Sequence, residues 1–170
     1  MKHKSAFATI GVKQPLALMK NLKEGLSVEL PDGTYIYPAD VVGPSRPGRK
    51  FVILGDTSNS DSLIAASRDC DVVVHEATNA KTSSETKSFE EVELSAISHG
   101  HSTPQMAGLF ARNCNAKMLL LNHFSARYKG DRSEESVAVM KEIEELAQAA
   151  FGRPDAIATY DHLTVIIPKP

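Results

Sequence analysis

Residues 71–78 read DVVVHEAT, a run of β-branched apolar residues that leads into a histidine and a glutamate. Two similar runs lie on either side of it in the sequence, FVILGD at 51–56 and KMLLLNHF at 117–124. Short, continuously apolar strands of this kind are typical of a sheet that helices cover. We therefore predict an α/β fold, with a mixed sheet and covering helices.

The segments between and after these strands carry helix signals. Ser102 or Thr103 is placed to cap a helix at TPQMAGLFARN, whose proline suits the first turn. The clearest helix spans residues 131–152, where Asp131 and Glu134 fit a capping box. Helices and strands thus alternate along this part of the chain.

Three further stretches complete the expected order of elements. The polar segment 79–98 is predicted to be a loop. The apolar segments 156–161 and 163–168 are predicted to be the closing strands.

The chain separates into two regions near residue 48. Residues 1–48 are rich in proline and contain an alternating hairpin pattern with Asp32-Gly33 at the turn, followed by a linker. Residues 49–170 carry the strand–helix alternation. The first fifty residues hold eight Lys/Arg and four Asp/Glu, whereas the rest hold eleven and seventeen. This basic excess is typical of a solvated, uneven surface or of an arm that faces phosphates.

Composition excludes some classes of protein. The net charge of −2 does not by itself indicate a nucleic-acid binder. No apolar run is long enough to span a membrane, and the N-terminus has no secretory pattern. The two cysteines are far apart in sequence, which favours a reduced intracellular compartment without indicating cytoplasm, nucleus or organelle.

Polar residues that can bind a metal or move a proton follow the predicted strands. Asp56 follows the first strand, His75 and Glu76 end the second, and His123 follows the third. The stretch HGHST at 99–103 precedes a predicted helix. Ligands bind outside the carboxyl ends of strands in α/β sheets, so these side chains are expected to meet at one edge.

Each of these residues also has a purely structural interpretation. Asp56 is placed to cap a helix, while His75 and His123 fit bonds to backbone carbonyls at the edge of a core. Arg127 and Tyr128 fit either packing or the binding of a phosphate and a base. The argument for a site therefore rests on their joint placement.

Four motifs in order resemble those of one known family. LGDT, HEAT, GHST and NHFSARY begin at residues 54, 75, 100 and 122, respectively. They resemble the second half of ribonuclease Z, the tRNA 3′-processing endonuclease of the metallo-β-lactamase superfamily. The resemblance covers residues 9–130 and the closing strands.

The resemblance implies a fold and a set of catalytic roles. The fold would be the second half of an αββα sandwich, with two zinc ions at the sheet edge of the complete enzyme. Asp56 would bridge the two ions, and His123 would bind one of them. His101 would act as general acid near the leaving 3′ oxygen. Such residues suit phosphodiester hydrolysis, because two cations polarise the phosphate and a histidine supplies the proton.

The resemblance also implies supporting and substrate-binding residues. His75 and Glu76 would support the site from behind. The substrate phosphate would be contacted by Ser125, Arg127 and Tyr128. Residues 9–45 resemble an arm that grips the tRNA body, with candidate contacts at Lys13, Lys20 and Lys23. Gln14-Pro15 replaces the family's usual Gly-Pro pair, which is a departure within this arm.

The family's HxHxDH signature does not occur in the 170 residues. The two-zinc site would therefore be incomplete, and we expect the chain alone to bind zinc poorly and to be inactive. A missing N-terminal half is a possible partner besides precursor tRNA. An apolar sheet face without its partner favours a homodimer or higher oligomer. The alternatives are a fragment of another phosphodiesterase with this fold, or a non-catalytic tRNA-binding module.

Overall fold

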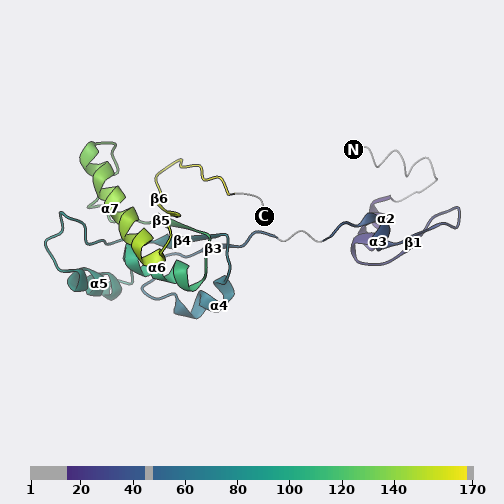
Figure 1. The fold of residues 1–170 in the computed structure, drawn as a ribbon, viewed down its shortest axis with the longest axis horizontal. Helices are drawn as coiled ribbons and strands as arrows, with labels where there is room; N and C mark the ends of the chain where they lie inside the picture. The colour runs from purple at the N-terminus through teal and green to yellow at the C-terminus, as the bar shows by residue number, and fades with distance from the viewer. Residues whose placement is uncertain (1–14, 45–47, 168–170) are drawn as a thin grey trace. The chain divides into compact units, whose positions relative to one another are not determined.

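The computed structural model describes residues 15–44 and 48–167. The chain divides into two units, Met1–Pro47 and Gly48–Pro170. Each unit is described by itself. The first is drawn in purple to blue in Figure 1, and the second runs from blue-green to yellow.

The first unit contains two short helices and the expected hairpin. Its elements are α2 (Pro15–Lys23), β1 (Val28–Glu29), β2 (Tyr35–Ile36) and α3 (Pro38–Val41). The strands β1 and β2 pair antiparallel. Gly33 adopts φ 83°, which the turn requires and which a side chain would oppose. The Asp32 carboxylate accepts a bond from Thr34 N at 3.0 Å, so this turn has the predicted residues at its tip.

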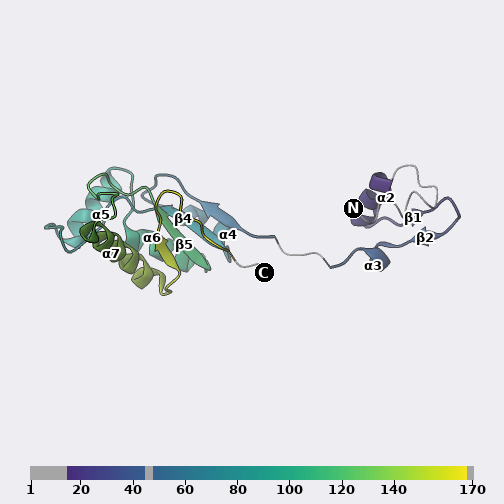
Figure 2. The ribbon, with the colours of Figure 1, turned by 90° about the horizontal axis from the view of Figure 1, so that it is seen from above.

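The second unit is built on a four-stranded sheet in the order β3-β4-β5-β6. Its strands are β3 (Phe51–Ile53), β4 (Val72–Glu76), β5 (Met118–Asn122) and β6 (Ala156–Ala158). All three pairings are parallel, and Figure 2 shows β4 and β5 running side by side. The expected mixed sheet was therefore wrong for the described residues. The segment 163–167, predicted as a strand, forms none, so it supplies no antiparallel partner.

The two faces of this sheet have different surroundings. One face packs against α6 (Pro104–Asn113) and α7 (Glu134–Phe151), which lie along the same side of the sheet in Figure 1. Leu119 and Leu121 of β5 are fully buried on it. Side chains alternate between faces along a strand, so Phe51 and Ile53 of the edge strand point to the opposite face. Their exposed fractions are 49% and 73%, which leaves apolar area open to solvent there.

The start of α6 matches the sequence prediction. Thr103 is its N-cap and accepts a bond from Met106 N, and Pro104 occupies the first turn. The helix then approaches α7 closely at Gly108. A Cβ at this position would lie 2.5 Å from the backbone oxygen of Ala147, so only glycine fits without displacement.

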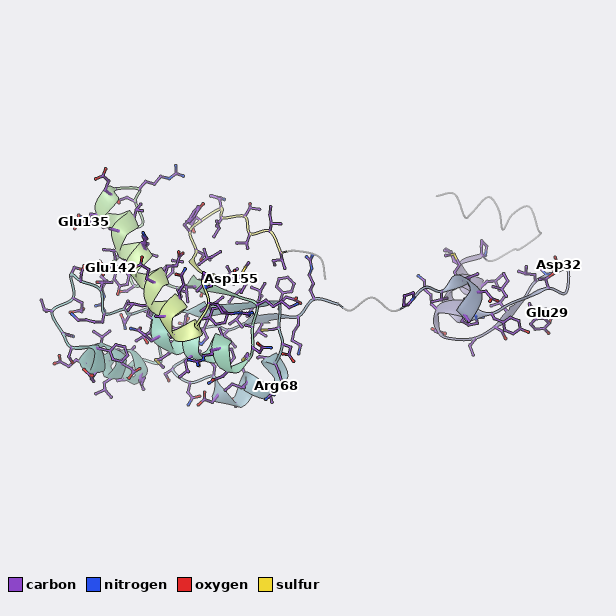
Figure 3. All side chains as sticks on the ribbon, in the orientation of Figure 1. Glu29, Asp32, Arg68, Glu135, Glu142 and Asp155 are labelled. Carbon is purple, nitrogen blue, oxygen red and sulfur yellow. The ribbon has the colours of Figure 1, made fainter. Side chains whose placement is uncertain are left out.

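The start of α7 differs from the prediction. Its N-cap is Ser133, whose side chain accepts a bond from Ser136 N. Asp131 lies outside the helix and accepts bonds from the Ser133 amide and hydroxyl at 3.1 and 2.6 Å. The expected Asp131–Glu134 capping box is therefore wrong by two residues. Farther along α7, Glu142, labelled in Figure 3, accepts bonds from Ser83 N and Oγ at 2.6 Å each.

Part of the predicted loop at 79–98 is the helix α5 (Phe89–Ser98). Ser88 and Glu91 form a reciprocal capping box at its start. Val92 and Ala96 are its buried residues. The S-x-x-E signal was present in the sequence, but the high polarity of the segment obscured it. Two short helical segments, η1 (Asp61–Leu63) and α4 (Ile64–Ser67), lie between β3 and β4.

Candidate metal centre

Three side chains from separate loops meet at the carboxyl edge of the sheet. Asp56 follows β3, His101 lies between α5 and α6, and His123 follows β5. One ligand atom from each lies within 4.8 Å of those of the others. Among residues 15–44 and 48–167, this is a group whose donor atoms suit a metal ion. The sequence had predicted that these loops converge.

The parallel strands explain the convergence. β3 pairs with β4 and β4 with β5, all in the same direction, so their carboxyl ends share one edge. His123 adopts φ 55°, which turns the backbone sharply at the end of β5. The gap between His123 Nδ1 and Asp56 Oδ1 is 3.5 Å.

A buried carboxylate, Glu76 at the end of β4, lies behind this group. Its side chain is fully buried. Oε1 accepts a bond from Thr57 N at 2.9 Å and lies 3.2 Å from His101 Nδ1. Oε2 accepts bonds from Thr78 N at 3.2 Å and from the Thr78 hydroxyl at 2.6 Å. Glu76 thus ties three loops together.

Burial alone would raise the pKa of Glu76, because it disfavours the charged form. Hydrogen bonds from Thr78, Thr57, Ser102 and His101 act in the opposite direction and together outweigh it. The pKa of Glu76 is consequently held below 4.5, and the group is a carboxylate at neutral pH.

The same bonds orient both imidazoles. An ionised Glu76 can only accept, so His101 must present Nδ1–H to it and keeps a lone pair on Nε2. Glu76 Oε2 lies 2.6 Å from the Thr78 hydroxyl and cannot donate, so the hydroxyl proton goes to Glu76. The hydroxyl oxygen can then accept a bond from His123 Nδ1–H, 2.9 Å away. In these tautomers Nε2 is the nitrogen of each ring that has a lone pair for a ligand.

Sequence reasoning missed the part that Thr57 and Thr78 play. Both threonines end the motifs that were singled out, GDT and HEAT, but attention went to the charged residues. Ser102 contributes in a similar way, since its hydroxyl donates to Thr57 O at 2.5 Å. The available signal was that GDT, HEAT and GHST each end in a residue with a hydroxyl group.

Three other histidines in the described part of the chain lie apart from the group. His75 lies on the helix-covered face, with Nδ1 2.8 Å from Glu76 O and its ring 5.6 Å from that of Phe110. Burial lowers its pKa, which favours the neutral form. His75 thus lies on the opposite face of the strand from the Glu76 side chain, and its expected supporting role stays a prediction. His99 ends α5, with Nδ1 2.7 Å from Ser95 O, and His162 lies in a turn.

The predicted phosphate-binding residues lie in the loop after His123. The Arg127 guanidinium contacts Glu85 Oε2 at 3.0 Å and Asn79 Oδ1 at 2.7 Å. The Tyr128 hydroxyl accepts a bond from Ala80 N at 2.8 Å. Ser125 Oγ accepts from Arg127 Nε at 3.2 Å. The three residues form a connected support for the loop, with the Arg127 side chain about half exposed.

Of the predicted arm lysines, Lys20 and Lys23 are exposed on α2, and Lys13 lies outside the described residues. Lys20 Nζ lies 3.7 Å from Glu24 Oε1, one turn along the helix. Residues 15–44 hold two lysines and four acidic residues, so the basic excess of the N-terminal region is not in this part. No helix in the described ranges is long and apolar enough to cross a membrane.

The fold and the site together define an α/β protein with a candidate metal centre at the carboxyl edge of a parallel sheet. No protein-family profile matches the chain. Its sequence is 39% identical to ribonuclease Z of Bacillus subtilis over 155 residues, which are 91% of this chain and 45% of that protein. It is 40% identical to ribonuclease Z of Halobacterium salinarum, over 88% of this chain and 42% of that protein. The chain is thus similar to these two ribonucleases Z over most of its own length, and it spans less than half of theirs.

Solved structures give weaker likenesses. Human tRNase Z, short form, is 31% identical, with a TM-score of 0.46 over 71% of this chain and 34% of that one. The metallo-beta-lactamase fold protein YhfI from Bacillus subtilis is 19% identical, with a TM-score of 0.45 over 78% and 43%.

Proposed function

We propose that this chain is the C-terminal half of a zinc-dependent endoribonuclease that removes 3′ trailers from precursor tRNA by phosphodiester hydrolysis. The observation that carries the proposal is the meeting of Asp56, His101 and His123 at one edge. Sequence identity of 39–40% to two ribonucleases Z supports the substrate class.

The donor set fits the metal. Zinc accepts imidazole nitrogen and carboxylate oxygen, and a carboxylate such as Asp56 has two oxygens with which to bridge two ions. Asp56 and His123 would hold zinc. When bound, the ions would polarise the scissile phosphodiester and lower the pKa of an attacking water.

His101 has the position of a proton donor. The Glu76 carboxylate lies 3.2 Å from Nδ1, so Nε2 is the nitrogen that remains for proton transfer. Through Nε2, His101 would deliver a proton to the leaving 3′ oxygen. Glu76 itself stays behind the histidine and positions it.

Substrate contacts are proposed on both units. Ser125, Arg127 and Tyr128 would contact the phosphate, although Arg127 would first have to loosen its bonds to Glu85 and Asn79. A hollow of about 1030 Å³ opens beside His123 and could receive flanking nucleotides. Lys13, Lys20 and Lys23 would contact the tRNA body.

The proposal includes a second polypeptide segment. The relatives are more than twice as long as this chain, and HxHxDH is absent from it. We therefore propose that the chain alone is inactive and is completed by a segment carrying those ligands. The open face with Phe51 and Ile53 would pack against that segment or, in its absence, against a second copy.

The test is reconstitution. The chain is mixed with a polypeptide carrying the HxHxDH half, and 3′ cleavage of precursor tRNA is measured with zinc. We expect cleavage by the mixture, none by either part, and none after Asp56→Asn; His99→Gln serves as the control that keeps activity. Cleavage of small diesters but not of precursor tRNA would favour another phosphodiesterase. Metal-free tRNA binding without rescue would favour a binding module.

A further inference from the structure

The chain already has three potential ligands without any other segment. Asp56, His101 and His123 bring their ligand atoms within 4.8 Å of one another. Three protein ligands are the number that a catalytic zinc usually has, with water in the fourth position. We propose that the isolated chain binds one divalent cation at this group, with His101 as the third ligand.

Under this proposal His101 has two roles: it is a metal ligand in the isolated chain and a proton donor in the reconstituted enzyme. As a ligand, it would bind the cation through Nε2, so that it could not carry a proton there. In the reconstituted enzyme, further ligands would hold the metal and leave His101 for proton transfer. The inference rests on the metal site proposed above, but not on tRNA cleavage, and it replaces our expectation of poor zinc binding.

The orientation of the rings supports this role. Glu76 lies 3.2 Å from His101 Nδ1 and only 2.6 Å from the Thr78 hydroxyl, which in turn is 2.9 Å from His123 Nδ1. One buried carboxylate therefore fixes both rings with Nε2 free. Outer partners of this kind prepare a site before the metal arrives, since the ligands need little reordering.

His101 is also better placed than its neighbour in sequence. The stretch 99–103 contains a His-x-His pair that suggests one metal held by both rings. His99 instead lies against Ser95 O at the end of α5, with Nδ1 at 2.7 Å. His99 is therefore a matched control that has the same residue type, the same loop and a different environment.

The experiment measures zinc affinity of the whole, tag-free chain by competition with a chromophoric chelator. We expect one zinc ion per chain. His101→Gln should lower the zinc affinity by more than about tenfold, because mutation of a residue that only supports a ligand already lowers metal affinity by about 10–100-fold. Asp56→Asn and His123→Gln should lose at least as much. His99→Gln should bind as the unaltered chain does. Far-UV circular dichroism of each variant establishes that it is folded.

A second measurement needs no substitution. Long-range proton–nitrogen NMR spectra of the unaltered chain should show zinc shifting Nε2 of His101 and His123, with His99 and His162 unchanged. If Asp56 and His123 variants lose binding but His101→Gln does not, and Nε2 of His101 does not shift, the inference is wrong while the proposed ligands stand. If no variant changes the affinity, or the chain binds no zinc, the inference is wrong. The ligands proposed for the reconstituted enzyme are tested separately, by the loss of precursor tRNA cleavage after Asp56→Asn.

Discussion

Replacing Glu76 by glutamine tests the carboxylate that joins the core to the site. Four hydrogen bonds of 2.6–3.2 Å reach its side chain, and in each of them Glu76 accepts: they come from the amides of Thr57 and Thr78, the Thr78 hydroxyl and His101 Nδ1. Glutamine has one acceptor oxygen and one NH₂, so it can serve only one side of this arrangement. The groups that donated to the other carboxylate oxygen, either those of Thr57 and His101 or those of Thr78, then face an NH₂ group, which is itself a donor.

The cost can be worked out from these contacts. The Thr78 hydroxyl can turn to His123 O, 2.9 Å away, and His101 can change tautomer. A backbone N–H cannot adapt, so the amide of Thr57 or of Thr78 is left facing the NH₂. A stranded buried N–H costs roughly 1–3 kcal/mol, and the remaining bonds lose their charge assistance, about 1 kcal/mol more.

Loss of the buried charge by itself would raise the free energy of unfolding, because the desolvation of the carboxylate no longer opposes folding. The pKa of Glu76 in the folded chain nevertheless lies below 4.5, so the hydrogen bonds outweigh desolvation. We therefore expect Glu76→Gln to lower the free energy of unfolding at pH 7 by about 2–4 kcal/mol. A lowered folded-state pKa stabilises the fold above pH 4.5, and this advantage shrinks as pH falls through the folded value.

Urea unfolding at pH 7 and at several lower pH values measures both effects. Glu145→Gln is the control, since Glu145 is exposed on α7 and pairs only with Lys141 at 3.8 Å. Its loss should stay within about 0.5 kcal/mol. A change of similar size for Glu76→Gln, or one that does not depend on pH, would refute the reasoning.

Three other changes test separate parts of the chain. Gly108→Ala places a Cβ 2.5 Å from Ala147 O, and we expect a net loss of about 1–2 kcal/mol in urea unfolding despite the better helix propensity of alanine; an unchanged midpoint would contradict this packing. Hydrogen bonds, chiefly from Ser133, lower the pKa of Asp131 to about 2, so its contribution is present above pH 3.8 and is lost as pH falls through 2. The stability difference between the unaltered chain and Asp131→Asn should accordingly disappear near pH 2, and a difference that persists there would be inconsistent with this role. Ile53→Lys should convert an associated chain to monomer in sedimentation velocity, unless the unaltered chain is already a monomer at micromolar concentration.

The sequence predicted the parts of the fold that rest on local chemistry. The apolar runs gave β3, β4 and β5, and Thr103-Pro104 gave the start of α6. The predicted mixed sheet was wrong because the last segment, 163–167, has a strand-like composition but forms no strand that could pair antiparallel. Ser133 rather than Asp131 caps α7 because two nearby candidates compete for one amide, which composition alone does not decide.

The candidate site was predictable in position but not in its internal roles. Strand order implied that Asp56 and His123 would share an edge, and parallel pairing brings them there. Nothing in HEAT distinguishes the residue that faces the site from the one that faces the core. Alternation along β4 makes that distinction: His75 points to Phe110, and Glu76 points to the opposite face.

This alternation also explains how one sheet and its loops can hold an ordered candidate site. The candidate ligands Asp56, His101 and His123 all belong to the second unit, and Glu76 at the end of its β4 contacts His101 directly and His123 through Thr78. Their geometry therefore depends on bonds within one sheet and its loops, not on the open face around Ile53. A partner segment would change how many ions the site holds and whether His101 is free. It would not have to build these side chains into place, so we expect metal binding to be separable from catalysis.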